Sequence, residues 1–185
     1  MAGDITGKTV AFVVTDGYED SELTSPWQAV EAAGGRAVLV APGGSGGSVS
    51  GKHGHAQPID QAVADSVAEQ FDALVIPGGV VNADHLRMDE DAVEFARGFF
   101  EQRKPVAVIC HGPWLLVEAD VVDGRRMTSY PSLRTDLTNA GADWVDEEVV
   151  VDQGLVSSRR PDDLPAFNAK LLEEIAEGEH ARQHA

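Results

Sequence analysis

Short, nearly continuous apolar runs alternate along the chain with longer segments in which apolar residues return every three or four positions. The runs are rich in Val, Ile and Leu and span residues 8–15, 36–40, 72–77, 106–109 and 155–158. Runs of this length, bounded by Gly, Pro or Asp, indicate strands that are buried on both faces. The alternation of strands with helices predicts an α/β fold with a mainly parallel sheet and helices on both faces.

The helices are predicted from their apolar faces and from the signals at their ends. Ser25 followed by Pro26 is typical of an N-cap and a first helical position, so we expect the first helix to begin there and to stop at Gly34-Gly35. Residues 145–151 and 155–158 flank a turn, which predicts a hairpin. Further helices are expected at residues 89–102, 113–119, 131–140 and 162–177.

Length and charge limit the classes of function. The 185 residues fit one domain over 1–185, with a core expected at 8–177 and a flexible tail at 178–185. The 31 acidic residues outnumber the 14 Lys and Arg and give a net charge of −17, which disfavours nucleic acid and membrane partners. The lone cysteine excludes an intrachain disulfide, and no apolar signal segment begins the chain. We therefore expect a cytoplasmic protein.

The glycine- and serine-rich segment at residues 42–51 raises the question of a phosphate site. Its glycines miss the GxGxxG spacing, because Val49 stands where the third glycine would fall, and no GK[ST] follows. Asp16, Glu19 and Asp20 after the first strand would also repel a phosphate. We interpret residues 42–51 as a flexible surface loop.

Unusual residues follow three of the predicted strands. Asp16–Asp20 follow the first strand, Gly78-Gly79 follow the strand at 72–77, and Cys110-His111 follow the strand at 106–109. The carboxyl ends of parallel strands open on one edge of the sheet, where ligands bind in α/β folds. We therefore expect these three turns to form one site.

Cys110 stands where a buried strand turns into a helix. Backbone N–H groups at a helix start stabilise a thiolate, so this position predicts a thiol of low pKa that is lifted towards solvent. The backbone N–H groups of His111 and Gly79 would then hold a developing oxyanion. A buried structural cysteine is the alternative.

The positions of His111 and Glu19 along the sequence leave more than one role open for each side chain. Adjacent side chains on a tight elbow usually point apart. We therefore expect the backbone N–H of His111, rather than its imidazole, to act at the site. Glu19 would hydrogen-bond the thiol if burial kept it protonated, and would otherwise be a solvated carboxylate. The pair His53/His55 has no nearby third ligand, and the pair His180/His184 lies at the C-terminal end of the chain, so we expect no metal at either pair. We also expect no cofactor.

Taken together, these motifs resemble the DJ-1/PfpI superfamily, and in particular its PfpI-like branch of stress proteins. The resemblance rests on Cys110-His111-Gly112-Pro113, on Gly78-Gly79 and on Glu19 in DGYEDSEL, and it covers roughly residues 8–174. It implies a flavodoxin-like three-layer sandwich, also described as class I glutamine amidotransferase-like. It further implies Cys110 as nucleophile, Glu19 as the acid paired with it, and a homodimer or higher homo-oligomer. The position that orients His111, often from a neighbouring subunit, corresponds to Asp84.

The resemblance implies several activities for the same thiol. Addition of a thiolate to glyoxal, methylglyoxal or an early glycation adduct needs only a nearby carboxyl to move a proton, and we favour this carbonyl chemistry. Peptide cleavage additionally needs an extended groove and a histidine that protonates the leaving amine. A redox sensor or chaperone that uses the oxidation of Cys110 is the non-enzymatic alternative.

Overall fold

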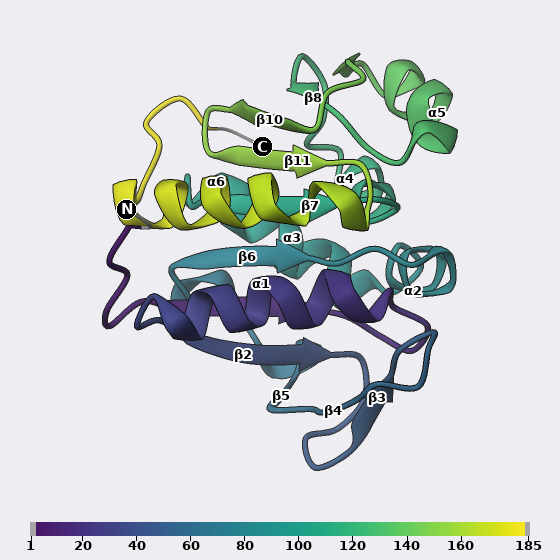
Figure 1. The fold of residues 1–185 in the computed structure, drawn as a ribbon. Coiled ribbons are helices and arrows are strands. Elements are labelled where there is room, and N and C mark those ends of the chain that lie inside the picture. The colour runs from purple at the N-terminus through teal and green to yellow at the C-terminus, as the bar shows by residue number, and fades with distance from the viewer. Residues whose placement is uncertain (1–2, 184–185) are drawn as a thin grey trace.

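The computed structural model describes residues 3–183 and places a mixed sheet at the centre of the molecule (Figure 1). Its seven strands have the order β10-β11-β7-β6-β1-β2-β5, and all neighbours are parallel except β10 and β11. This arrangement confirms the predicted α/β class. The strands are β1 (Thr9–Val13), β2 (Arg36–Ala41), β5 (Gln61–Ala62), β6 (Ala73–Ile76), β7 (Val106–Ile109), β10 (Val149–Asp152) and β11 (Leu155–Ser158).

Helices cover both faces of the sheet. The front face in Figure 1 carries α1 (Asp20–Ala32) and α6 (Leu164–Glu177), which pack against each other. The remaining α-helices are α2 (Val80–Leu86), α3 (Glu90–Glu101), α4 (Pro113–Glu118) and α5 (Arg134–Asn139). Four 3₁₀ turns complete the helical segments: η1 (Val63–Asp65), η2 (Ala68–Gln70), η3 (Pro131–Leu133) and η4 (Pro161–Asp163).

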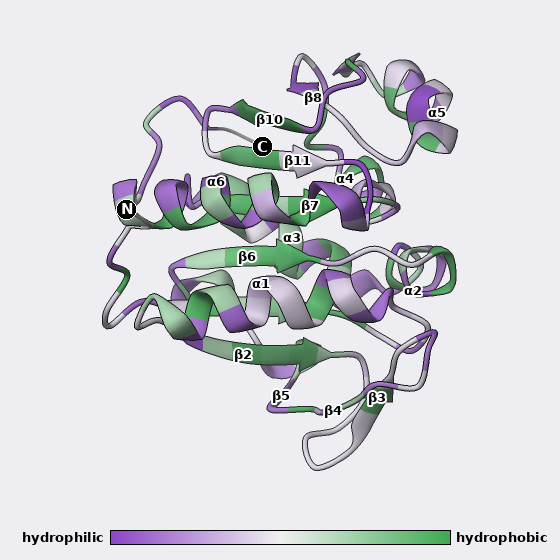
Figure 2. Cartoon of the chain, viewed as in Figure 1, coloured by the Kyte–Doolittle hydropathy of each residue, from purple (hydrophilic) through white to green (hydrophobic). Residues whose placement is uncertain are grey.

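The alternation of side chains along each strand produces two cores. In β1, Ala11 and Val13 belong to one core, whereas Val10 and Phe12 belong to the core beneath α1 and α6. Because both faces of the strand are covered, β1 is apolar from Val10 to Val13 and shows no period of two. Figure 2 shows mostly hydrophobic colouring along the central strands and mixed colouring along the helices.

The glycine- and serine-rich segment is more ordered than the sequence predicts. β3 (Ser48–Ser50) pairs in antiparallel fashion with β4 (Ala56–Pro58). The Lys52 amide donates to the carbonyl of Tyr18 at 2.8 Å and thereby fixes the tip of this hairpin against the turn after β1. A second small ribbon pairs β8 (Arg126–Met127) with β9 (Asp143–Trp144).

The first helix begins at Asp20, earlier than the predicted start at Pro26, with Glu19 as the N-cap residue. Pro26 therefore lies inside the helix, where it has no N–H to donate to the carbonyl of Glu22, a defect that usually costs about 3 kcal/mol. The early start places Glu22 on the buried face, together with Leu23. The early start of the helix therefore determines that Glu22, and not Glu19, points into the protein.

The chain after α6 lies against the body of the protein over the residues that the structure describes. The amide of His180 donates to the carbonyl of Arg103 at 2.9 Å, and Gln183 Nε2 donates to the carbonyl of Lys104 at 2.7 Å. The sequence predicts a flexible tail for this segment; its last two residues, including His184, lie outside the described part. Over residues 3–183, the helices are all too short or too polar to cross a bilayer.

Candidate active site

Cys110 occupies a strained elbow between β7 and α4. Its φ is +63°, a left-handed conformation that costs a non-glycine residue about 1–2 kcal/mol. Two hydrogen bonds hold the elbow: the Cys110 amide donates to the carbonyl of Ser158 at 3.1 Å, and the Cys110 carbonyl accepts from the amide of Tyr130 at 2.9 Å. A Cβ on Gly112 would lie 2.8 Å from the carbonyl oxygen of Ile76, so the turn also needs this glycine.

Gly78 and Gly79 bring the end of β6 directly against the elbow. A Cβ on Gly78 would lie 2.7 Å from the Cβ of Cys110, and Gly79 has a φ of +91°. A Cβ on Gly79 would also meet the carbonyl oxygen of Gly17. The backbone amides of Gly79 and His111 both interact with the Cys110 sulfur and favour its thiolate. The structure thus brings these two amides to the thiol, where the sequence analysis places the oxyanion donors.

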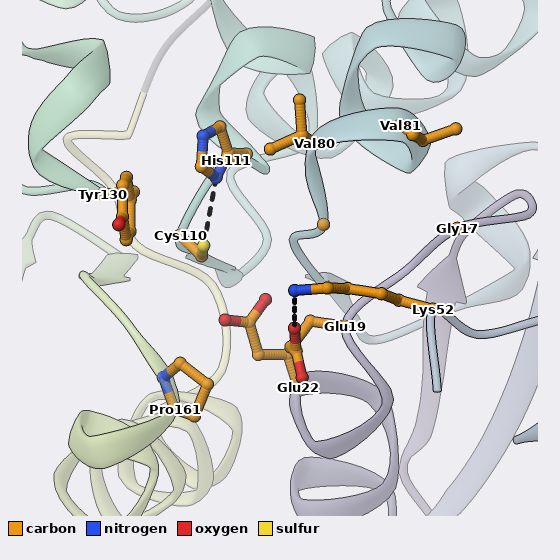
Figure 3. A pocket seen from close by; sticks show the side chains of 11 residues that line it. Gly17, Glu19, Glu22, Lys52, Val80, Val81, Cys110, His111, Tyr130 and Pro161 are labelled. Carbon is orange, nitrogen blue, oxygen red and sulfur yellow. Dashed lines mark hydrogen bonds and ion pairs between the residues drawn. The ribbon is translucent and has the colours of Figure 1, made fainter. Parts of the chain in front are cut away.

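The acid beside the thiol is Glu22, and the prediction that Glu19 is its buried partner is wrong. Glu22 is fully buried, and its Oε2 accepts the amide of Gly78 at 2.8 Å. Figure 3 shows its carboxyl pointing towards Cys110. Glu19 instead pairs with Lys52 and His53, each at 3.4 Å, at the edge of the pocket. The cause is the early start of α1, which turns Glu22 inward and leaves Glu19 as the N-cap.

Burial sets the protonation of Glu22. It raises the pKa of the carboxyl to about 8, against the lowering effects of the Gly78 amide and the Cys110 thiol. Glu22 is therefore mainly protonated at pH 7. Its second oxygen, Oε1, makes no hydrogen bond to any residue within 3–183. Since Oε2 already accepts an N–H, the proton of the neutral carboxyl stands on Oε1.

The thiol itself departs from the expected low pKa. Burial and then the negative charge of Glu22 raise the pKa of Cys110, and the Gly79 and His111 amides only partly oppose this rise. The amides at the turn are evident from the sequence, whereas the burial of the thiol and the nearby carboxyl of Glu22 become evident only in the fold. Since the two groups face each other in a buried site, their ionisations oppose each other.

The imidazole of His111 lies against the sulfur, although adjacent side chains on an elbow usually diverge. Its Nδ1 is 3.2 Å from the Cys110 Sγ, and its Nε2 is 3.3 Å from the Ser132 hydroxyl. The ring stacks on Tyr130 with 4.8 Å between centroids. Burial lowers the pKa of His111, so the ring is neutral at pH 7 and can accept a proton.

Asp84 is not brought to His111 within the chain. It lies on the exposed side of α2 and does not line the pocket around the thiol. Among the described residues, Ser132 occupies the position at Nε2 that the sequence analysis gave to a carboxylate. The triad Cys110–His111–Asp84 is therefore absent from a single subunit.

The thiol opens into one pocket of about 540 Å³, a volume typical of a small-molecule site. Lys52 from the β3–β4 hairpin and Pro161 from η4 close two of its sides (Figure 3). Sequence reasoning missed both residues, because nothing local links them to the thiol. The pocket is lined by Gly17, Glu19, Glu22, Lys52, Gly79, Val80, Val81, Cys110, His111, Tyr130 and Pro161.

The sequence of this chain matches a known protein family over most of its length. The DJ-1/PfpI family pattern matches residues 8–174, which include every element of the sheet and of the site. The chain belongs to the DJ-1/PfpI family.

Similar proteins carry two kinds of name. "Putative cysteine protease YraA" of Bacillus subtilis is 49% identical over 165 residues, covering 89% of this chain and 96% of that protein. "Protein/nucleic acid deglycase 2" of Escherichia coli is 46% identical over 167 residues, covering 89% and 96%.

A solved structure shows the same fold within a longer chain. The two-domain protein of Anabaena variabilis with DJ-1/ThiJ/PfpI-like and ferritin-like domains matches with a TM-score of 0.88 and 36% identity. The match covers 91% of this chain and 48% of the Anabaena chain, so this chain spans about half of that protein.

Proposed function

We propose that this protein is a cysteine-dependent enzyme that converts small reactive carbonyl compounds, such as glyoxal and methylglyoxal, to hydroxy acids. The observation that carries the proposal is the meeting of Cys110, His111 and Glu22 in one small pocket. These residues supply a nucleophile, a neutral base and a second proton carrier. A free thiol of this kind needs a reducing compartment, which supports a cytoplasmic setting.

In the first step the Cys110 sulfur adds to the aldehyde carbon and forms a hemithioacetal. The thiol proton passes to His111 Nδ1, which lies 3.2 Å from the sulfur. The electron pair of the carbonyl bond moves to oxygen, where the amides of Gly79 and His111 stabilise the charge. The oxyanion then takes the proton back from the imidazolium. This order overcomes the raised pKa of the thiol, because deprotonation and bond formation occur together.

In the second step Glu22 moves a proton between the two carbons of the dicarbonyl skeleton. A carboxylate with a pKa of about 8 is a stronger base than an ordinary one, and about a tenth of it is ionised at pH 7. It takes the proton from the hemithioacetal carbon and returns it to the adjacent carbon, while the hemithioacetal hydroxyl proton passes to the oxygen on that adjacent carbon. The product is a thioester of the hydroxy acid. Water then cleaves the thioester, releases the acid and restores the thiol.

The same addition would act on early glycation adducts, whose carbonyl-derived carbon is still electrophilic. The relative named deglycase supports this extension. We also propose that the protein is a homodimer or higher homo-oligomer. Val80, Val81 and Tyr130 are 52%, 51% and 40% exposed beside the pocket, and an adjoining subunit would cover them. Asp84 on the same helix would then act across that boundary or remain outside the site.

A cysteine peptidase is the second candidate, because the contact between the Cys110 sulfur and His111 Nδ1 is a nucleophile–base pair. The relative named as a cysteine protease points in the same direction. A peptidase uses His111 to protonate the leaving amine, whereas the carbonyl reaction depends on Glu22. The pocket volume of about 540 Å³ favours the smaller substrate.

Turnover of methylglyoxal and of a fluorogenic peptide, without added cofactor, tests the proposal. Cys110→Ala should reduce methylglyoxal turnover to the buffer rate. His111→Ala should lower it by about 10²-fold, the lower range for a lost acid–base group, and leave it measurable. A wild-type protein that cleaves the peptide but does not consume methylglyoxal would replace the carbonyl proposal with the peptidase.

A further inference from the structure

Three side chains with metal-binding atoms meet at the C-terminal end of α6. Glu174 and Glu177 belong to the last turns of the helix, and His180 lies beyond its end, after Gly178 and Glu179. The ligand atoms of the three residues all lie within 4.8 Å of one another. The cluster is at the opposite end of α6 from Pro161, which lines the pocket, so it is separate from the site described above (Figure 1).

The buried member of the cluster has an unusual environment. The Glu174 side chain is only 7% exposed, and its Oε2 lies 3.0 Å from His180 Nε2. The two atoms form an ion pair when the ring is protonated, and neither makes a hydrogen bond to any described residue. A buried carboxylate oxygen without a hydrogen-bond donor is costly. These two atoms and a carboxylate oxygen of Glu177 all lie within 4.8 Å of one another, which is close enough for them to share one cation.

The backbone holds His180 in this place independently of its ring. Its amide donates to the carbonyl of Arg103 at 2.9 Å, and its carbonyl accepts the amide of Gln183 at 2.9 Å. Gly154, with a φ of +88°, leaves room for the imidazole, because a Cβ there would lie 2.7 Å from the His180 Cδ2. The ligand position is therefore fixed before an ion arrives, which lowers the entropic cost of binding.

We propose that Glu174, Glu177 and His180 bind a divalent transition-metal ion of the Zn²⁺ type. An imidazole nitrogen with two carboxylates is a donor set that suits zinc and its neighbours, whereas magnesium and calcium prefer oxygen ligands alone. Three protein ligands leave one tetrahedral position for water. The sequence expectation of no metal considered only pairs of histidines, and the carboxylates become ligands only because α6 presents positions 174 and 177 to residue 180.

The bound ion would join the end of α6 to the segment that follows it. Because an ion that binds only the folded chain stabilises it by mass action, free Zn²⁺ at 100 times its dissociation constant should lower the unfolding equilibrium constant about 100-fold. A protonated His180 that forms only an ion pair with Glu174 would give no such dependence on the metal. The inference is independent of the carbonyl chemistry proposed for Cys110.

Zn²⁺ titration calorimetry on the untagged full chain tests the site. All variants carry Cys110→Ala, so that the active-site thiol cannot bind the ion. We expect one Zn²⁺ per chain, at least tenfold weaker binding in His180→Ala and in Glu177→Gln, and unchanged binding in Glu173→Gln. Glu173 is the matched control, because it is an exposed neighbour on α6 that pairs with Lys170.

Thermal unfolding with and without Zn²⁺ supplies an independent readout. Zn²⁺ should raise the midpoint of the Cys110→Ala and Glu173→Gln chains and leave that of His180→Ala unchanged. The Glu177 side chain is exposed and the His180 side chain is only partly buried, so the variants at both positions are expected to fold. Absence of saturable binding to the Cys110→Ala chain, or full affinity in either ligand variant, would overturn the proposal.

Discussion

Replacing Glu22 with glutamine should make the protein more stable at neutral pH. The folded carboxyl has a pKa of about 8, against 4.5 for the ordinary side chain. Between these values the folded state keeps a proton that the unfolded state releases, so the contribution of Glu22 to stability falls as pH rises. At pH 7 the carboxyl of Glu22 is ionised in the unfolded state and mainly protonated in the folded state. This difference lowers the free energy of unfolding by about 3 kcal/mol. Glutamine cannot ionise, and its carbonyl can still accept the Gly78 amide.

The expected gain is therefore up to about 3 kcal/mol at pH 7, or roughly 6–12 °C in the unfolding midpoint for a chain of this size. Urea unfolding followed by tryptophan fluorescence at pH 5, 6 and 7 measures it. The difference between the variant and the wild type should grow by about 1.4 kcal/mol per pH unit over this range, because the other titrating groups cancel.

Glu19→Gln is the matched control. It removes ion pairs with side chains that are 60% and 62% exposed, so it should change stability by less than about 1 kcal/mol, and in the destabilising direction. A difference between Glu22→Gln and wild type that stays flat from pH 5 to pH 7 would refute the raised pKa of Glu22. The reasoning that assigns its proton-carrying role would then fail as well.

Two further predictions concern the turns around the thiol. Gly79→Ala should lower the free energy of unfolding by at least about 2 kcal/mol, because alanine would be forced to a φ of +91° and its Cβ would meet the carbonyl oxygen of Gly17. An unchanged midpoint of urea unfolding would contradict this prediction. Alkylation of Cys110 by iodoacetamide should show a pH midpoint above the ordinary cysteine pKa of about 8.5. Glu22→Gln should lower that midpoint, because it removes the negative charge beside the thiol. A midpoint below about 8 in the wild type would instead support the low thiol pKa that the sequence predicts.

The sequence was sufficient for the fold and for placing Cys110 at the edge of the sheet beside Gly78-Gly79. Apolar runs bounded by Gly and Pro located the central strands, and the parallel arrangement followed from their alternation with helices. Cys110 at the end of β7 and Gly78-Gly79 at the end of β6 then had to open on one edge of the sheet. These inferences succeeded because they depend on local pattern and on topology alone.

The acid could have been found, but only by reading the helix through a proline. Glu22, Leu23, Pro26 and Val30 form one buried face of α1, and their spacing of one, three and four residues is helical. With Pro26 as the first helical position, Glu22 would lie in a loop, and Glu19 is then the predicted acid. The general preference of proline for helix starts thus outweighed the periodicity of the apolar face.

Other parts of the site depend on contacts between distant segments. Lys52 reaches the pocket because β3, which lies within the segment 42–51 interpreted as a loop, pairs with β4. Ser132 meets His111 across more than twenty residues, through the turn into η3. The role of Asp84 and the assembly of the protein stay predictions, since they concern surfaces between subunits.

The kcat/KM for methylglyoxal in Glu22→Gln and Glu19→Gln tests the central claim most directly. The account predicts that Glu22→Gln loses about 10²- to 10⁴-fold while remaining folded, as expected when a general acid–base group is removed, and that Glu19→Gln stays within about threefold of the wild type. A Glu22→Gln protein with wild-type kcat/KM, or a larger loss in Glu19→Gln than in Glu22→Gln, would contradict it.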